Sequence, residues 1–340
     1  MYKGYLVMGR LLMSEELIDK CLNLYAKSGL TKKYYKTDLM KIKKHIEEKN
    51  ISLDELKHED IRNFFNEYEK KYATETVNRC KNATSFFFRY LVKNRYLSVD
   101  SEIIISDLER KIPDNKQEKY LNKNEIETLL NFLKDAPRQR GEVKSTFDFL
   151  RSRDTFLFTL LITRGLRATE TSRLTLDSID IKNKRINISK NIRKNGNNKY
   201  GLDLSVILDE NLIDLYNKYL IEREKISTDN DYLFVKPNGN PLFVFKDSEY
   251  VAGGTLSEVL KKRVRQVNMY HSIRNPSLKP IDTTISIHCL RHTASYYLQS
   301  QGLFTLSEIA YTLGQKSLKS TTKYSHINSQ DIEEKLNSII

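Results

Sequence analysis

The spacing of apolar residues from residue 14 to about residue 100 is helical throughout, and it limits what the first part of the chain can form. Apolar positions such as Leu17, Cys21 and Leu24 recur every three or four residues, with many lysines between them. The alternation of apolar and polar residues that predicts strands is nearly absent there. We therefore predict four helices that pack as one unit, at about 14–28, 31–49 and 59–72 and from Thr74 or Thr76 onward.

The segment 101–120 interrupts this pattern and is the predicted linker. It contains Pro113-Asp114-Asn115 and a run of charges, both typical of a loop. A strong helical pattern resumes after Leu121, and 340 residues are enough for two domains with separate cores. The predicted parts are an N-terminal tail at 1–13, a helical domain at 14–100, the linker, a second domain at 121–326 and a C-terminal tail or helix at 327–340.

In the second domain, an arginine stands directly after a predicted helix end. An apolar helix is predicted from Arg153 to Arg164, and Gly165 suits the backbone conformation that ends many helices. Arg167 follows this corner. A guanidinium held there can bind a phosphate, because it donates two parallel hydrogen bonds and stays charged. Glu170 can orient it, although Arg167 taken alone also fits an ordinary exposed ion pair.

A basic hairpin is predicted next. Ile186 and Ile188 alternate with polar residues, the alternation returns at 202–206, and Asn195-Gly196 is a typical hairpin turn. Between residues 181 and 203 no residue is acidic. The basic residues there are Lys182, Lys184, Arg185, Lys190, Arg193, Lys194 and Lys199. Such a tip fits a DNA backbone, and the alternative is a charged edge that prevents aggregation.

The charge of the whole chain also favours a polyanionic partner. Its net charge is +13, which attracts nucleic acid, although a merely soluble basic protein would have the same composition. The candidate DNA contacts are Lys41, Lys44 and Arg79 in the first domain, Lys190, Arg193 and Lys199 in the hairpin, and Lys261, Lys262, Arg263 and Arg265 in a basic helix predicted from Thr255 to Met269.

The three cysteines and the hydropathy indicate the cellular compartment in which the protein is expected. The cysteines are far apart and form no CxxC pair, so neither a zinc site nor a disulfide framework is predicted, and a reducing compartment fits best. No run of about 20 apolar residues predicts a membrane span. We therefore expect a cytoplasmic protein associated with the nucleoid, without a membrane partner.

The last part of the second domain combines a histidine, an arginine and a tyrosine. His288 and Arg291 are one turn apart at the start of a predicted helix, 288–301, so both can reach one site. The helix dipole favours an anion at that end. Tyr324 follows on a short polar segment. Singly, His288 fits a structural histidine and Tyr324 is one of 20 tyrosines.

The order of these motifs resembles that of the tyrosine recombinase family, which includes phage-type integrases, Xer-type recombinases and transposon integrases. The motifs are GLRATE at 165–170, the basic hairpin, HCLRHT at 288–293 and TTKYSH at 321–326. The resemblance covers about 14–330 and is specific in the second domain. It implies a mainly α fold with a small antiparallel β-sheet, in which a helical core-binding domain and a catalytic domain form a C-shaped clamp on DNA.

The resemblance also implies roles for individual residues. The residues that match the family's catalytic positions are Arg167, His288, Arg291 and the nucleophile Tyr324. Lys194 is the expected hairpin lysine, with Lys190 and Lys199 as alternatives. Glu170 and His292 are expected to support them. No metal or cofactor is expected, because the arginines supply the positive charge.

One position departs from the family pattern. After Leu313-Gly314 the family has His or Trp, whereas this chain has Gln315. A glutamine can donate a hydrogen bond to a phosphate oxygen, but it does not shuttle a proton at neutral pH. Gln315 is therefore interpreted as a working substitute, as a device that slows the reaction, or as the mark of an inactive protein.

The sequence thus predicts a site-specific recombinase that cleaves and rejoins double-stranded DNA through a 3′-phosphotyrosyl bond to Tyr324. The family implies a dimer on one recombination site and a tetramer in the synapse. Two alternatives remain open: a site-binding or architectural protein of the same fold without turnover, and a type IB topoisomerase-like enzyme. The target site, the choice among integration, excision, resolution and inversion, and docking of the tail in cis or in trans are also open.

Overall fold

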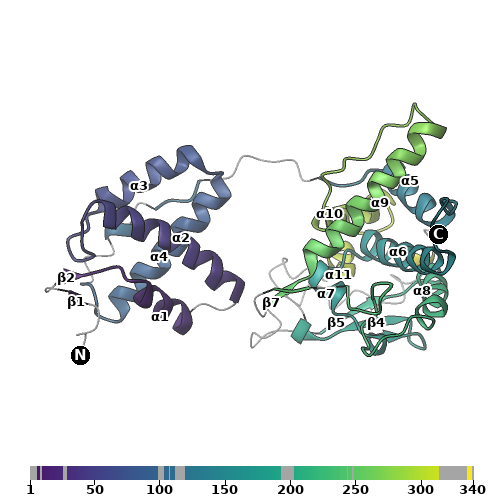
Figure 1. Cartoon of the computed structure of the whole chain (residues 1–340), viewed down its shortest axis with the longest axis horizontal. Helices are drawn as coiled ribbons and strands as arrows, with labels where there is room; N and C mark the ends of the chain where they lie inside the picture. Colours follow the sequence, from purple (N-terminus) through teal and green to yellow (C-terminus); the bar gives the residue numbers. More distant parts are fainter. Residues whose placement is uncertain are drawn as a thin grey trace. The chain divides into compact units, whose positions relative to one another are not determined.

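The computed structural model describes residues 6–7, 10–25, 29–98, 103–106, 108–111, 119–192, 203–242, 244–246, 249–313 and 335–338. They belong to two compact units, 1–117 and 118–340, each of which is described here by itself (Figure 1). Each unit has its own hydrophobic core. Of the helices described, none combines the length and the apolar character that crossing a membrane requires.

The first unit is a group of helices. They are α1 (Glu15–Tyr25), α2 (Gly29–Glu48), α3 (His58–Lys71) and α4 (Thr74–Lys93). Their apolar faces meet in a core that includes Leu17, Ile42 and Phe87. The four predicted helices are therefore confirmed. The threonine cap predicted for the fourth is wrong, because Ala73 occupies the N-cap position of α4 without a side-chain cap.

The first core extends beyond the residues predicted for this domain. A short antiparallel pair, β1 (Leu6–Val7) and β2 (Arg10–Leu11), precedes α1. Leu11 is buried, and its carbonyl oxygen accepts a hydrogen bond of 2.8 Å from the backbone N–H of Leu53. Ile104 and Ile105, in the segment for which a linker was predicted, lie in the same core. Apolar residues that precede and follow the four helices in the sequence are thus buried against them.

The second unit is built around one helix. Its helices are α5 (Lys123–Asp135), α6 (Lys144–Arg164), α7 (Ala168–Ser172), α8 (Glu210–Arg223), α9 (Ala252–Arg274), α10 (Ile287–Ser300) and α11 (Leu306–Thr312). α6 packs against α5, α8 and α10 (Figure 1). Its residues from Phe156 to Ile162 are buried on every side. The helix begins at Lys144, before the predicted start at Arg153. The prediction missed the first turns because they are more polar than the apolar run on which it was based.

A small sheet covers one part of this unit. Its strands are β3 (Ile179–Asp180), β4 (Arg185–Ile188) and β5 (Leu204–Ile207), antiparallel and in that order. Ile186 is opposite Val206, and Ile188 is opposite Leu204. Ile186 and Ile188 are buried at alternate positions as predicted, and on β5 both Val206 and Ile207 are buried, so the two strands are confirmed whereas strict alternation holds only on β4. The Asn195-Gly196 turn lies outside the described residues.

Two further pieces of β structure belong to the second unit. β6 (Val244–Lys246) pairs with β7 (Glu249–Val251), a pair that the sequence did not predict. The segment 231–235 contributes two isolated bridges, Thr175 with Tyr232 and Val235 with Pro241.

Candidate active site

The corner between α6 and α7 requires a glycine. Gly165 ends α6 with φ of 59° and ψ of 31°, in the left-handed region that non-glycine residues rarely adopt. A Cβ atom placed there would lie 2.6 Å from Cδ2 of Leu313 and 3.0 Å from Cβ of Ala294. The predicted C-cap is therefore confirmed, and the side chains of Ala294 on α10 and of Leu313, which follows α11, lie close to it.

Arg167 stands just after this corner and is held by Glu170. Nη1 of Arg167 donates to Oε1 of Glu170 at 2.9 Å, and the backbone N–H of Arg167 donates to Oε2 of the same carboxylate at 2.9 Å. Glu170 is fully buried, whereas 35% of the Arg167 side chain is exposed. One carboxylate therefore binds both the backbone and the guanidinium of an arginine whose side chain remains partly exposed.

Arg291 reaches the same corner from α10. Its Nη1 donates to the carbonyl oxygen of Gly165 at 2.5 Å, and its Nη2 donates to the carbonyl oxygen of Leu313 at 2.8 Å. The structure thus brings Arg291 to the turn that carries Arg167, although the two arginines are far apart in sequence. One shared site for Arg167 and Arg291, which the family pattern implied, stays a prediction.

His288 lies in the first turn of α10, one turn before Arg291. Its side chain is exposed, and its ring meets that of His292 edge to face, with centroids 4.8 Å apart. The N-terminus of this helix is the end at which the helix dipole favours an anion. The predicted helix is confirmed, and it contains His288 and Arg291 three positions apart.

A buried ion pair ties the corner to the hairpin. Arg164 is 1% exposed, its Nε donates to the carbonyl oxygen of Ile207 at 2.8 Å, and its Nη2 binds the carboxylate of Asp209. Burial lowers the pKa of Arg164, and the charge of Asp209 opposes this effect. Sequence reasoning missed this pair because no local spacing relates the two residues. The only signal was a charged residue at the end of an apolar helix.

Of the candidate basic residues in the hairpin, the structure describes Lys190. Lys190 is exposed, and its backbone N–H donates to Oδ1 of Asp203 at 2.6 Å, which links the two arms of the hairpin near its tip. Five predicted site residues lie outside the part of the chain that the structure describes: Arg193, Lys194, Lys199, Gln315 and Tyr324.

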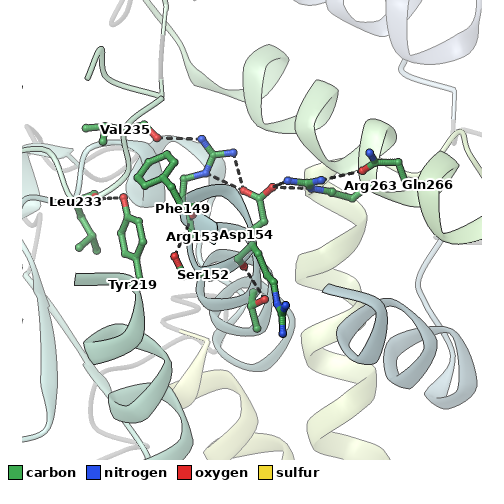
Figure 2. Close-up of polar contacts among 11 residues, drawn as sticks. Phe149, Ser152, Arg153, Asp154, Tyr219, Leu233, Val235, Arg263 and Gln266 are labelled. Atoms are coloured by element: carbon green, nitrogen blue, oxygen red, sulfur yellow. Dashed lines mark hydrogen bonds and ion pairs between the residues drawn. The ribbon is translucent and has the colours of Figure 1, made fainter. Parts of the chain in front are cut away.

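The basic candidates on α9 differ in their surroundings. Lys262 and Arg265 are exposed and Lys261 is half-buried. Arg263 binds the fully buried Asp154 through Nε at 2.7 Å and Nη2 at 2.6 Å (Figure 2). Its guanidinium is therefore engaged inside the unit rather than held toward solvent.

In the first unit, two of the three candidates surround a buried carboxylate. Arg79 binds Asp38 through Nε at 2.7 Å and Nη2 at 3.1 Å. Lys41 donates from Nζ to the hydroxyl of Tyr68 at 2.8 Å. Lys44 is exposed and lies 3.7 Å from Glu48. Asp38 thus binds Arg79 of α4 and lies 4.0 Å from Nζ of Lys41 of α2.

The described part of the C-terminal tail contacts its own unit. Leu336 is 2% exposed and packs with Ile207, Leu298 and Leu313. Lys335 forms an ion pair of 2.6 Å with Glu308 on α11. Among the described residues, no three His, Cys, Asp or Glu side chains gather as metal ligands would.

Known proteins match the chain over nearly its whole length. The Phage integrase family model matches residues 119–331, and the model of the Phage integrase N-terminal SAM-like domain matches residues 15–97. Tyrosine recombinase XerD of Shewanella oneidensis is 23% identical over 335 residues, which are 96% of this chain and 97% of that protein. Tyrosine recombinase XerC of Oceanobacillus iheyensis is 22% identical over 311 residues, 90% of this chain and 88% of that protein.

Solved structures share the fold. The Tn1549 transposon integrase in complex with transposon right end DNA has a TM-score of 0.65 at 17% identity, covering 96% of this chain and 98% of that one. The XerH site-specific recombinase in a post-cleavage complex with palindromic difH substrate has a TM-score of 0.62 at 20% identity, covering 95% and 84%. At these identities the likeness establishes the fold.

Proposed function

The chain belongs to the phage integrase family and is a site-specific tyrosine recombinase, and from this premise we propose that Tyr324 attacks one DNA phosphate held by Arg167 and Arg291. The observation that carries the proposal is the hydrogen bond from Arg291 to the carbonyl oxygen of Gly165, two residues before Arg167. It joins two arginines from distant segments at one corner of the fold.

The arginines supply the charge that the reaction needs. As the phosphate becomes pentacoordinate, its non-bridging oxygens gain negative charge, and two fixed guanidinium groups stabilise it. Glu170 holds Arg167 in place, so little reorganisation is required when the charge develops. The partially exposed side chain of Arg167 is consistent with access to DNA.

The nucleophile needs help to lose its proton. A tyrosine has an ordinary pKa of about 10, so only roughly one in a thousand is a phenolate at pH 7, a cost of about 4 kcal/mol. We assign His288, which is exposed on the first turn of α10, as the base or hydrogen-bond partner at that phosphate. Gln315 is assigned as a hydrogen-bond donor in place of the family's His or Trp.

The leaving group needs a proton in turn. The bond from phosphorus to the tyrosine oxygen forms as the bond to the 5′-oxygen breaks, and that oxygen takes a proton from the hairpin lysine, for which we assign Lys194. The products are a 3′-phosphotyrosyl bond and a free 5′-hydroxyl. Attack of a 5′-hydroxyl on this ester reverses the step, so rejoining requires no ATP.

We further propose that the enzyme acts in the cytoplasm on double-stranded DNA, as a dimer on each recombination site and a tetramer in the synapse. The proteins similar to this chain include Xer recombinases and a transposon integrase, which supports a role in resolution or in movement of a mobile element. Exposed lysines and arginines such as Lys44, Lys262 and Arg265 are proposed to contact phosphates.

A suicide substrate tests this proposal. The binding site is first selected from a pool of random DNA duplexes with the Tyr324→Phe protein. The selected duplex is then nicked near the scissile phosphate, so that a short fragment escapes after cleavage and the covalent complex accumulates. We expect a protease-sensitive adduct that retains a 5′ label placed upstream of the cut.

Two variants make the outcome specific. Tyr324→Phe should form no adduct, whereas Tyr311→Phe, which changes another tyrosine of the same region, should form as much adduct as the wild type. An adduct that persists in Tyr324→Phe, or a wild type that binds the selected site but never becomes linked to it, would refute the proposed function.

A further inference from the structure

The ion pair between Arg164 and Asp209 occupies a position that the proposed mechanism leaves unexplained. Arg164 is the last residue of α6 and precedes the Gly165 corner. Its Nε donates to the carbonyl oxygen of Ile207, the last residue of β5, at 2.8 Å. Its Nη2 binds Asp209, two residues beyond that strand. One side chain therefore connects the Arg167 corner with the base of the basic hairpin.

Asp209 is itself fixed in place. Its Oδ1 accepts a hydrogen bond of 2.8 Å from the backbone N–H of Leu212 and so caps the N-terminus of α8. The other carboxylate oxygen, Oδ2, faces Arg164. The pair is thus anchored on one side by a helix cap and on the other by the end of α6. The base of β5 has little freedom to shift against the corner while both contacts are made.

Stability alone does not account for such a pair. Taking two charges out of water is costly, and replacing a buried ion pair by apolar side chains of similar volume is often neutral or stabilising. What an ion pair adds is direction, because an arginine forms hydrogen bonds at defined angles to particular acceptors. Here the acceptors are the strand end and the carboxylate that follows it.

The corner is held in the same way from its other side. Arg291 donates to the carbonyl oxygen of Gly165, the residue after Arg164. Two neighbouring residues of one turn therefore bind the two other segments of the proposed site, α10 through Gly165 and the hairpin base through Arg164. Arg291, which is 9% exposed, has a proposed role at the phosphate, whereas Arg164, which is 1% exposed, has none.

We propose that Arg164 is a positioning residue that sets where the basic hairpin, and with it the catalytic lysine, meets the leaving 5′-oxygen. This inference rests on the proposed function. The role proposed here for Arg164 differs from the roles proposed for the catalytic residues, because Arg164 touches neither DNA nor the reacting atoms. Loss of the Arg164 contact should therefore impair protonation of the leaving group more than binding of DNA.

Substrate chemistry can separate this role from a merely structural one. In a duplex whose scissile 5′-oxygen is replaced by sulfur, the leaving group is a thiolate. Thiols ionise far more readily than alcohols, so a thiolate departs without a proton from the enzyme. A variant in which the lysine is misplaced should regain cleavage on this substrate, whereas a variant with displaced arginines should not.

The test variant removes the pair without leaving a lone buried charge. Arg164→Met combined with Asp209→Asn replaces the ion pair by neutral side chains, and asparagine remains a good N-cap for α8. Unfolding in urea and the affinity for the selected duplex, measured by fluorescence anisotropy, establish that the full-length variant folds and binds DNA.

The same helix provides a matched control. Arg153 is also buried in α6, and it also binds a carboxylate, Asp154, and a backbone carbonyl oxygen, that of Val235 at 3.0 Å (Figure 2). Its contacts do not include β5. In Arg153→Met, Asp154 keeps Arg263 as its partner. This variant should lose stability without any change in preference for the sulfur substrate.

The expected result is a difference between substrates. The Arg164→Met/Asp209→Asn variant should form adduct with the ordinary duplex at least about tenfold more slowly than wild type, but within about threefold of wild type on the sulfur duplex, since general acid catalysis contributes about 10²–10⁴-fold. An equal defect on both substrates, no defect, or the same relief in Arg153→Met would overturn the inference. If wild type forms adduct with neither substrate, it is the proposed function that fails.

Discussion

Nη1 of Arg291 donates a hydrogen bond to the carbonyl oxygen of Gly165, 2.5 Å away and 126 positions earlier in the chain. The second terminal nitrogen of the same guanidinium binds the carbonyl oxygen of Leu313. Because both acceptors are backbone atoms, the position of Arg291 depends on the course of the chain at the corner and at the end of α11.

Replacement of Gly165 by alanine should disturb both the fold and the proposed site. The residue has φ of 59°, and the added Cβ would lie 2.6 Å from Cδ2 of Leu313. A left-handed backbone costs an ordinary residue about 1–2 kcal/mol, and overpacking adds about 1–3 kcal/mol. We expect urea unfolding of Gly165→Ala to report a loss of about 3 kcal/mol in the free energy of unfolding.

Gly302 provides the matched control for this variant. It has a similar φ of 68°, and none of the described residues has an atom within 4 Å of the position that a Cβ would take. Gly302→Ala should therefore cost about 1–2 kcal/mol, from the backbone alone. Equal losses in the two variants would mean that close packing of the corner against Leu313 is not what requires the glycine.

Replacement of Glu170 by glutamine should weaken the hold on Arg167. The carboxylate accepts from both the backbone and Nη1 of Arg167, and a glutamine can present only one oxygen. The loss of a buried charge-assisted hydrogen bond costs about 1–3 kcal/mol. Because the affected arginine is proposed to bind the phosphate, adduct formation on the suicide duplex should slow by about tenfold or more.

Glu125→Gln is the control for the loss of a helix cap. Glu125 occupies the equivalent position in the capping box of α5, where its carboxylate accepts from the backbone N–H of Asn122 at 2.9 Å. That box contains no arginine. We expect a small loss of stability and an unchanged rate of adduct formation. If the rate of adduct formation in Glu125→Gln falls as far as in Glu170→Gln, the contact between Glu170 and Arg167 has no special role.

Local patterns explain what the sequence could predict. Gly165, Arg167 and Glu170 lie within one turn, and His288 and Arg291 lie on one helix face, so spacing alone relates them. The alternation around β4 and β5 likewise follows from one buried face. In each case the information is contained in a few neighbouring residues.

Contacts between distant residues explain what the sequence could not predict. From the sequence, Arg263 is expected to be one of several exposed cations on a basic helix. In the structure it binds Asp154, which lies 109 positions earlier. Arg164 and Asp209 are separated by 45 positions and follow no repeat. Which charges become buried depends on how the helices pack, and that packing is not expressed in periodicity or composition.

Leu336 provides a test of how the tail docks. Its side chain is buried among residues of its own unit, including Ile309 and Leu313. Truncation of a buried leucine to alanine typically costs about 2–5 kcal/mol. Leu336→Ala should therefore lower the free energy of unfolding of the second unit by at least about 2 kcal/mol. Leu306→Ala, at an exposed leucine of α11, should change it by less than about 0.5 kcal/mol.

The dependence on protein concentration distinguishes docking in cis from docking in trans. If the tail binds its own unit, the unfolding midpoints of wild type and of Leu336→Ala are both independent of concentration. Measurements of urea unfolding over a hundredfold range of dilution would check this. A wild-type midpoint that falls on dilution, and a Leu336→Ala midpoint that does not, would instead indicate exchange of tails between molecules.

The ion pair that holds this tail should depend on pH. Burial raises the pKa of Glu308, but hydrogen bonds from Lys335 and from Thr305 outweigh this and lower the pKa below its ordinary value of 4.5. A depressed carboxyl pKa adds stability that is fully present above about pH 4.5 and is lost as the pH falls through the folded-state value. The contribution of the pair should therefore disappear in acid.

A double-mutant cycle measures that contribution directly. Glu308→Gln, Lys335→Met and the double variant should give a coupling energy of about 0.5–1 kcal/mol at pH 7, which declines as the pH falls below about 4.5. The pair of Asp214 and Lys218 is the control, because both side chains are more than half exposed and should couple weakly at every pH. A coupling between Glu308 and Lys335 that stays constant down to pH 3 would mean that the interaction does not depend on the ionised carboxylate.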